Sequence, residues 1–352
     1  MAGPVIQTFD FFIQWHLTER CNLHCRHCYQ SPRKKRELDA QEVIREIDGA
    51  TAMFRAWERE AGIKIRPSIH FTGGEPFLYR GLREVLEHAS RQGYATAVMT
   101  NGTLIGGEEA LYLHDLGVRD IQISLEGPPV IHDAIRGEGA FAAARRGIAQ
   151  LTAAGNTVSA NVTLSRLNVK AMAETVSCAR QMGIAAIGFS RLVPCGRGRH
   201  ILDLFLTPEE VRTAFEQVNS MNASGVPPGI RVLSCDPLYG TLSERLPPRD
   251  RALTLSGCSA GFSGLTVTGS GEVMACRRIG IRAGTLGKQS LREIWSTSPH
   301  LWELRERKNY RGRCGACDRW PSCRGCRAVA LAHSKARGRA DLFADDPQCW
   351  LS

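Results

Sequence analysis

The 352-residue chain lacks the segments that place a protein in or across a membrane. Its N-terminus, MAGPVIQTFDFFIQW, has no basic region and no long apolar run, so we expect no signal peptide. No window approaches the roughly 18 consecutive apolar residues of a membrane span. Low-complexity tracts, solenoid repeats and nucleic-acid-binding motifs are also missing. These absences predict a globular protein of the cytoplasm.

Negative charge is also in short supply, since the formal net charge is +10. A basic surface serves solubility or binds an anionic partner, such as nucleic acid or an acidic protein. However, this count treats every cysteine as neutral, and thiolates would remove part of the excess. Together with the missing motifs, this disfavours nucleic-acid binding.

Cysteine, in contrast, is abundant, with 13 residues. In a cytoplasmic chain this favours metal ligands or catalytic thiols over disulfides. Cys21, Cys25 and Cys28 lie close together in CNLHCRHCY, with no fourth cysteine nearby. The site could bind zinc with His24 or His27 as the fourth ligand, or hold a redox pair of thiols. It could also hold a [4Fe–4S] cluster with one open iron, which the spacing favours.

Short apolar runs alternate with amphipathic segments over roughly the first 215 residues. Strands alternating with helices predict a parallel sheet, either an incomplete barrel or a doubly wound sheet. In both, functional residues lie at the carboxyl ends of the strands. We expect strands at 11–18, 68–73, 96–101, 120–127, 157–165 and 186–193, and helices at 38–62, 81–93, 107–116, 140–154, 168–182 and from 207 onward.

The pattern stops at about residue 222, where Pro and Gly become frequent. We therefore expect a core domain at 1–221, a linker at 222–255 and a C-terminal domain at 256–352. In the last, we expect a β-hairpin over 264–276, a short helix at 290–295 and cysteine-rich loops. So little apolar core requires cross-links, which here would be metal.

Four motifs together resemble the radical S-adenosylmethionine (SAM) superfamily. They are CNLHCRHCY after the first strand, GGEP (73–76) after the second, TNGT (100–103) after the third and ISLEG (123–127) at the fourth. The resemblance implies a partial (β/α)6 TIM-like barrel. It also implies a [4Fe–4S] cluster on Cys21, Cys25 and Cys28, with SAM on the open iron.

Further SAM-binding residues are implied around this site. Gly73, Gly74 and Glu75 would hold the methionyl amino group of SAM, because glycines allow close approach and a carboxylate caps a cation. Polar strand-end groups suit the ribose and carboxylate, and rings suit the adenine. These candidates are Ser124, Glu126, Asn161 and Arg166 for the polar groups, and His27 and Tyr29 for the rings. Each could instead be an ordinary strand-end or loop residue.

The second cysteine group comprises Cys258, Cys276, Cys314, Cys317, Cys323, Cys326 and Cys349. Seven cysteines exceed the needs of one metal ion, and the gap between the two C-x2-C pairs is too short for a zinc ribbon. The arrangement resembles the SPASM extension, with two residues instead of the usual three before Cys326. The resemblance implies two auxiliary [4Fe–4S] clusters, one on Cys258, Cys276 and Cys326, and one on Cys314, Cys317, Cys323 and Cys349.

The first auxiliary cluster lacks an obvious fourth ligand. Cys235 is a candidate, and otherwise it is an ordinary thiol that leaves an open iron for substrate. Cys195 follows the sixth strand and is expected to face the active site, where it could donate a hydrogen atom or serve as a structural thiol. Cys178 fits a helix core.

The resemblance implies that SAM is cleaved reductively and that a 5′-deoxyadenosyl radical takes a hydrogen atom from the substrate. Similar SPASM enzymes mostly modify peptides, and some act on haem precursors. Arg277 stands where sulfatase maturases carry an Asp base, which disfavours formylglycine formation. Arg277 and Arg278 suit a carboxylate, in an acidic peptide or a porphyrin propionate.

We therefore expect a peptide maturase that makes a crosslink or oxidation, with tetrapyrrole modification as the second hypothesis. A non-catalytic iron–sulfur electron carrier or scaffold is the alternative of another class. The expected partners are a substrate peptide and a low-potential donor, flavodoxin or ferredoxin. Because the barrel begins at about residue 11, leader binding would need a separate protein or the basic surface.

Overall fold

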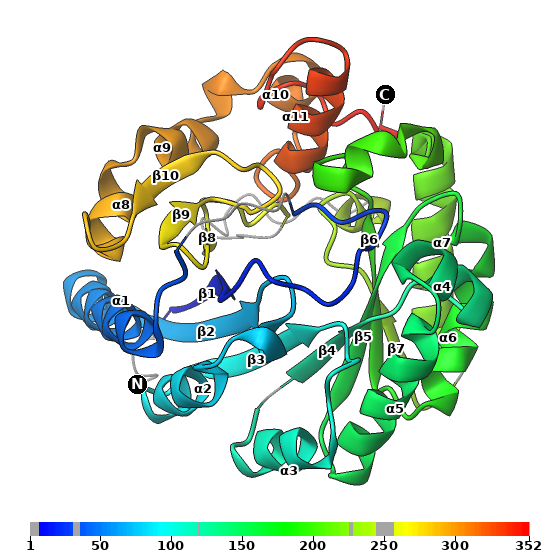
Figure 1. The fold of residues 1–352 in the computed structure, drawn as a ribbon. Coiled ribbons are helices and arrows are strands. Elements are labelled where there is room, and N and C mark those ends of the chain that lie inside the picture. Colours follow the sequence, from blue (N-terminus) through cyan, green and yellow to red (C-terminus); the bar gives the residue numbers. More distant parts are fainter. Residues whose placement is uncertain (1–6, 31–35, 119, 225–227, 244–256, 352) are drawn as a thin grey trace, which may run out of the picture.

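A computed structural model describes residues 7–30, 36–118, 120–224, 228–243 and 257–351. The strands of this part form one ten-stranded sheet in the order β10-β9-β8-β1-β2-β3-β4-β5-β6-β7. All neighbours from β8 through β1 to β7 are parallel, and the sheet curves into a partial barrel (Figure 1). The strands are β1 (Thr8–His16), β2 (Lys64–Thr72), β3 (Ala95–Thr100), β4 (Asp120–Ser124), β5 (Val158–Leu164), β6 (Ala186–Arg191), β7 (Arg231–Leu233), β8 (Gly264–Val267), β9 (Glu272–Met274) and β10 (Arg282–Thr285).

Helices α1 to α7 lie outside the curved sheet and cover its apolar face (Figure 1). They are α1 (Ala40–Ala61), α2 (Leu82–Arg91), α3 (Gly107–Asp115), α4 (Pro129–Arg136), α5 (Ala140–Ala153), α6 (Met172–Gln181) and α7 (Pro208–Ser224). The C-terminal region carries α8 (Leu291–Thr297), α9 (Pro299–Arg305), α10 (Gly312–Ala316) and α11 (Arg327–Ala336). Short 3-10 helices η1 (Pro76–Leu78), η2 (Val169–Ala171), η3 (Gly196–His200), η4 (Leu202–Leu204), η5 (Tyr239–Leu242) and η6 (Arg307–Asn309) connect them.

Helix α1 shows why the sequence signals were sufficient for the barrel. Asp39 accepts a hydrogen bond from the Glu42 amide, and the Glu42 side chain accepts one from the Asp39 amide. This capping box fixes the helix start, and Gly62 at φ +63° ends it in the left-handed region. Val43 and Ile47 are then buried on the face toward the sheet. The expected fold class, a partial α/β barrel followed by a hairpin-containing domain, is confirmed.

Strand β8 joins the C-terminal domain to the barrel. It pairs in parallel with β1, from Phe12 opposite Gly264 to Trp15 opposite Val267. The expected hairpin follows as β8 and β9, and its turn places Gly271 at φ +78°. A domain expected to be separate therefore continues the barrel sheet on the β1 side (Figure 1).

Strand β7 lies inside the stretch expected to be a linker, and it pairs with β6. That stretch, 222–255, also holds the end of α7 and η5, so its described residues are structured. Residues 225–227 and 244–256 lie outside the described part. The three domain boundaries remain predictions.

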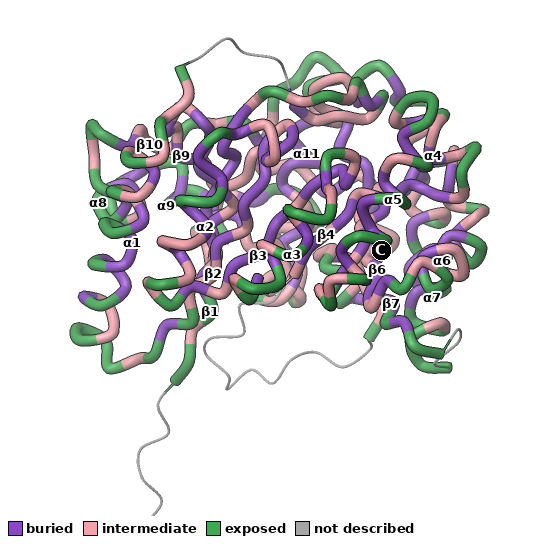
Figure 2. The backbone as a smooth tube through the Cα atoms, turned by 60° about the horizontal axis from the view of Figure 1, so that its bottom comes forward, coloured by how far each residue is buried: buried purple, intermediate pink, exposed green. Residues whose placement is uncertain are grey.

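A buried ionic network closes the other side of the barrel. Arg191 at the end of β6 is 2% exposed, and its guanidinium donates to Asp236 at 2.8 Å and to Asp346 at 2.9 Å. It thus ties β6 to the segment after β7 and to the C-terminal residues, in the buried interior that runs through both domains (Figure 2). Within the described residues, no helix is long and apolar enough to cross a membrane.

Candidate active site

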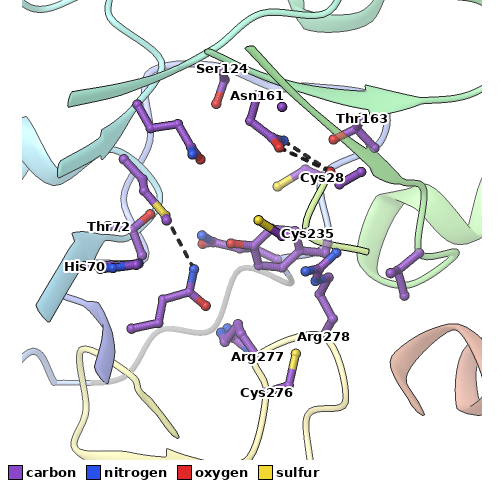
Figure 3. A pocket seen from close by; sticks show the side chains of 18 of the residues that line it. Cys28, His70, Thr72, Ser124, Asn161, Thr163, Cys235, Cys276, Arg277 and Arg278 are labelled. Atoms are coloured by element: carbon purple, nitrogen blue, oxygen red, sulfur yellow. Dashed lines mark hydrogen bonds between the residues drawn. The ribbon is translucent and has the colours of Figure 1, made fainter. Parts of the chain in front are cut away.

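A cavity of about 1600 Å³ opens inside the barrel. The loop of Cys21, Cys25 and Cys28 lines it from the barrel side, and Cys258, Cys276 and Cys326 line it from the C-terminal domain. Figure 3 shows Ser124, Asn161 and Thr163 on one side of this cavity and Cys276, Arg277 and Arg278 on the other. The structure therefore brings the first cysteine group and three cysteines of the second to the same cavity.

The first cysteine loop presents sulfurs that accept N–H hydrogen bonds. The Leu23 amide lies 3.4 Å from Cys21 Sγ, and Asn101 Nδ2 lies 4.0 Å from it. The Arg136 guanidinium lies 3.7 Å from Cys25 Sγ. Such donors stabilise the thiolate form that iron requires, and hydrogen bonds to sulfur tune cluster potentials. The residues present therefore fit an iron–sulfur cluster.

The GGEP segment holds this loop against the end of β1. The amide of Gly74 donates to the Thr18 carbonyl at 2.7 Å, and that of Glu75 donates to the Arg20 carbonyl at 2.8 Å. A Cβ at Gly73 would lie 2.5 Å from the Thr18 oxygen, and one at Gly74 would lie 2.1 Å from the Arg20 oxygen. The close approach that demands glycine is thus an approach to the cysteine loop itself.

Two subsets of the second cysteine group have different surroundings, and their assignment to two clusters stays a prediction. Cys258, Cys276 and Cys326 pack against one apolar cluster, formed by Val193, Ala260, Ile279, Leu304, Ala328, Val329, Leu331, Ala332 and Leu342. Electrostatic coupling joins Cys314, Cys323 and Cys349 to one another. Here too N–H groups point at sulfur, from Arg327 to Cys314 at 3.6 Å and from the Gly325 amide to Cys323 at 3.4 Å.

Comparisons with known proteins agree with this geometry. The family model of the radical SAM superfamily matches residues 15–179, and that of the SPASM iron–sulfur cluster-binding domain matches residues 258–327. Mycofactocin maturase MftC of Mycobacterium tuberculosis is 30% identical, over 99% of this chain and 87% of the relative. The chain belongs to the radical SAM superfamily.

Two further comparisons cover nearly the whole radical SAM chain. AdoMet-dependent heme synthase of Nitratidesulfovibrio vulgaris is 28% identical, over 96% of this chain and 91% of the relative. The crystal structure of Streptococcus suis SuiB bound to S-adenosylmethionine superposes with a TM-score of 0.77. It covers 98% of this chain and 78% of that chain at 16% identity, and so shares the fold. The protein is an enzyme, with SAM and iron–sulfur clusters as its cofactors.

Glu75 of this radical SAM enzyme faces the protein and not the cavity. It is buried, and its carboxylate accepts hydrogen bonds from the Phe77 amide, the Thr100 hydroxyl and the Asn101 amide, at 3.3, 2.7 and 2.9 Å. Burial raises the pKa of Glu75, against the lowering effect of these donors. Its expected contact with SAM stays a prediction, and the observed contacts orient the TNGT segment.

Glu126 is likewise buried and does not line the cavity. His27 lies 3.1 Å from one carboxylate oxygen, the Thr163 amide donates to the other, and Arg136 forms an ion pair with the same carboxylate. Although burial acts to raise the pKa of Glu126, His27 and Arg136 hold it well below its usual range. Glu126 thus orients Arg136 toward Cys25.

Arg136 was missed by the sequence analysis because α4 was missed. The signal was present, since Pro128 and Pro129 mark a helix start and Arg136 stands in the last turn. Only the fold, however, shows that this turn points back at the cysteine loop.

The remaining expected SAM contacts divide between the cavity and the surface. Ser124, Asn161, His27 and Tyr29 line the cavity. Burial raises the pKa of Tyr29 to about 12. Arg166 does not line it, because the guanidinium lies at the surface, 3.2 Å from Glu210 and 3.1 Å from the Asp203 carbonyl. The structure therefore separates Arg166 from the other candidates.

The tandem arginines after Cys276 have different surroundings. Arg277 donates to both carboxylate oxygens of Glu19, at 3.1 and 2.9 Å, and its side chain is 10% exposed. Arg278 is exposed to the cavity and forms no ion pair or hydrogen bond with another described residue. Arg277 was expected to bind a substrate carboxylate, but it already pairs with Glu19, whereas Arg278 lines the cavity without such a partner among the described residues.

Cys195 and Cys235 lie in different surroundings. Cys195 was expected to face the active site, but it is absent from the cavity wall and packs against the apolar cluster behind it. Cys235, on the segment after β7, is exposed and lines the cavity (Figure 3).

Proposed function

We propose that this radical SAM enzyme modifies a peptide, with Cys21, Cys25 and Cys28 holding the SAM-binding cluster. The seven SPASM cysteines would hold the two auxiliary clusters. When bound and reduced, the first cluster supplies the electron that cleaves SAM to methionine and the 5′-deoxyadenosyl radical, which takes a hydrogen atom from the substrate. The protein holds the substrate within reach and keeps water from the radical.

The chain's own groups prepare this site. Arg136, held by Glu126, donates toward Cys25 and favours its thiolate. Gly73 and Gly74 fix the cysteine loop against β1. Ser124, Asn161 and the neighbouring rings at the cavity wall are in place to bind SAM.

The inner wall of the barrel carries the observation that favours a peptide. Beside Phe12, His70 and Met99, it brings a set of amides and hydroxyls to the cavity: Gln14, Thr72, Gln122, Ser124, Ser159, Asn161, Thr163 and Ser190. A peptide main chain brings one donor and one acceptor per residue, and these side chains match both. A flat apolar macrocycle would offer no partner to those that form no hydrogen bond within the protein, and an unmet polar group shielded from water is costly.

Arg278 adds a preference for a carboxylate. The carboxylates of Glu19, Glu37 and Asp236 line the same cavity and pair with arginines of the protein, and Asp120 at the start of β4 lines it as well. Arg278, two residues after Cys276, is a positive charge on the cavity wall that no described carboxylate pairs with. A carboxylate of the peptide, at its C-terminus or on an acidic side chain, can pair with the guanidinium in bidentate fashion.

Tetrapyrrole modification is the second candidate. It is favoured by the relatives named AdoMet-dependent heme synthase and by Arg278, which suits a propionate equally well. Under both hypotheses, the Arg278→Lys variant keeps the charge but loses the planar fork. We expect this variant to bind the substrate more weakly. Its cleavage of SAM without substrate should be unchanged.

One assay decides between the two. The reconstituted enzyme is reduced and incubated with SAM and either short peptides encoded beside its gene or Fe-coproporphyrin III. We expect 5′-deoxyadenosine together with a mass change on a peptide. A mass change on the porphyrin alone would contradict the peptide proposal. Adding flavodoxin, ferredoxin or a separate leader-binding protein tests the proposed partners, through the rate of the same mass change.

A further inference from the structure

Three cysteines of the SPASM domain share one apolar cluster, yet a [4Fe–4S] cluster has four irons to ligate. Cys258, Cys276 and Cys326 pack against the cluster that Val193, Ile279 and Val329 help to form. A fourth thiol packs against the same apolar residues. It is Cys195, which comes from the barrel and not from the SPASM domain.

The chain around Cys195 is held in place on both sides. Val193, two residues earlier, is itself buried in the apolar cluster, and its carbonyl accepts a hydrogen bond from the Cys195 amide at 2.8 Å. After it, Gly196 stands at φ +58°, where a Cβ would lie 2.5 Å from the Tyr29 carbonyl carbon. The Arg197 amide donates to the Cys28 carbonyl at 2.8 Å, and the Arg197 guanidinium donates to the Cys25 carbonyl at 3.0 Å.

Charge around the thiols fits an anionic cluster. A four-thiolate [4Fe–4S] cluster carries about −2, and burial of that charge requires cations nearby. Arg278 interacts electrostatically with Cys276, Cys326 and Cys195, and Arg191 interacts with Cys326. Two arginines thus lie within electrostatic reach of these thiols, although Arg191 also pairs with Asp236 and Asp346.

Cys235 is the competing thiol, and its surroundings differ. It is exposed, lines the cavity and does not pack against the apolar cluster. Burial and the neighbouring carboxylate of Asp236 raise the pKa of Cys235. Because Cys258, Cys276 and Cys326 also line the cavity, what distinguishes Cys195 from Cys235 is its packing against the apolar cluster that these three thiols share.

We propose that Cys195 is the fourth ligand of the auxiliary cluster held by Cys258, Cys276 and Cys326. Ligation replaces its S–H bond with an S–Fe bond and releases the proton to solvent. This cluster then has no open iron, so the substrate carboxylate meets Arg278 and not iron. The inference rests on the proposed cluster ligands, and it makes the end of β6 a covalent link between the barrel and the SPASM domain.

The test removes the SAM-binding cluster first, by changing Cys21, Cys25 and Cys28 to Ala in the full chain. This protein should hold about eight iron atoms, four in each auxiliary cluster. Into it we introduce Cys195→Ala, Cys195→Ser, Cys235→Ala or, as a matched control thiol in α6, Cys178→Ala. Electron paramagnetic resonance of the reduced clusters is recorded with and without cyanide, a ligand for an open iron.

Cys195→Ala should either lose about four iron atoms or gain a cyanide-dependent spectrum, and Cys195→Ser should change the spectrum while retaining iron. Cys235→Ala and Cys178→Ala should match the parent. Full iron with an unchanged, cyanide-insensitive spectrum in Cys195→Ala would overturn the proposal, as would a spectral change in Cys235→Ala. Fewer than about eight iron atoms in the protein that lacks only Cys21, Cys25 and Cys28 would instead contradict the proposal that the SPASM cysteines hold two clusters.

Discussion

The two cysteine regions of this enzyme reach similar chemistry by opposite routes. Cys21, Cys25 and Cys28 lie on one short loop, which main-chain hydrogen bonds from Gly74 and Glu75 hold to the end of β1. The SPASM cysteines are gathered from positions 258 to 349, and their region depends on long-range ties such as Arg191 to Asp346. The first site, which we call local, is positioned by the barrel strands next to it. The SPASM site, which we call dispersed, is positioned by contacts between residues far apart in the chain.

The largest expected effect comes from the local site. Cys25→Ala removes a buried sulfur that accepts from Arg136, so SAM cleavage should fall to background. About four iron atoms should be lost, and the auxiliary signals should persist, because they belong to the other region. Iron analysis measures the loss of the cluster, and the release of 5′-deoxyadenosine measures SAM cleavage. Cys178→Ala is the control. Loss of the auxiliary signals as well would show that the two regions are not independent.

Asp346→Ala tests the dispersed region. It removes one of the two carboxylates that pair with the buried Arg191, leaving Asp236, and it removes the acceptor of the Cys326 amide, 2.7 Å away. Breaking a buried pair from one side costs about 3–5 kcal/mol. Chemical unfolding should show this loss, while Glu216→Ala, which breaks the exposed pair with Arg212 on α7, should change stability by less than about 1 kcal/mol. Equal effects of the two variants would argue against the network as the main tie.

The same contrast explains what the sequence could predict. Periodicity and caps were sufficient for the barrel, because each β/α unit is encoded by neighbouring residues such as Asp39 and Glu42. The cysteine loop was found for the same reason. Strand β7, the pairing of β8 with β1 and the partners of Arg191 were not found, since each joins residues far apart in the chain. Arg166 was expected to bind SAM because it follows a barrel strand. Only the fold shows that its guanidinium pairs with Glu210 at the surface.

The end of β1 offers a pH test at the border of the two regions. His16 is fully buried, and burial, followed by Arg277, lowers its pKa to about 3. The unfolded chain therefore binds this proton more tightly, and folding loses stability as pH falls below about 6.5 toward 3. At pH 5.5 the loss is about 1.4 kcal/mol. His16→Phe should flatten this part of the pH profile in urea unfolding, and an unchanged profile would remove His16 as its cause.

The smallest expected effect comes from the ion pair that spans the two regions. Glu19 precedes the first cysteine loop and pairs with Arg277, which follows Cys276. Glu19→Gln keeps the shape and one acceptor but removes the charge, so we expect a loss of about 1 kcal/mol in unfolding. SAM cleavage should stay within about twofold, because the loop is held by the main-chain bonds of Gly74 and Glu75. Glu210→Gln, in the exposed pair with Arg166, is the matched control. If Glu19→Gln instead lost auxiliary iron, the SPASM cysteine region would need this contact with the first cysteine loop. The two regions would then not be independent, even if Cys25→Ala left the auxiliary clusters intact.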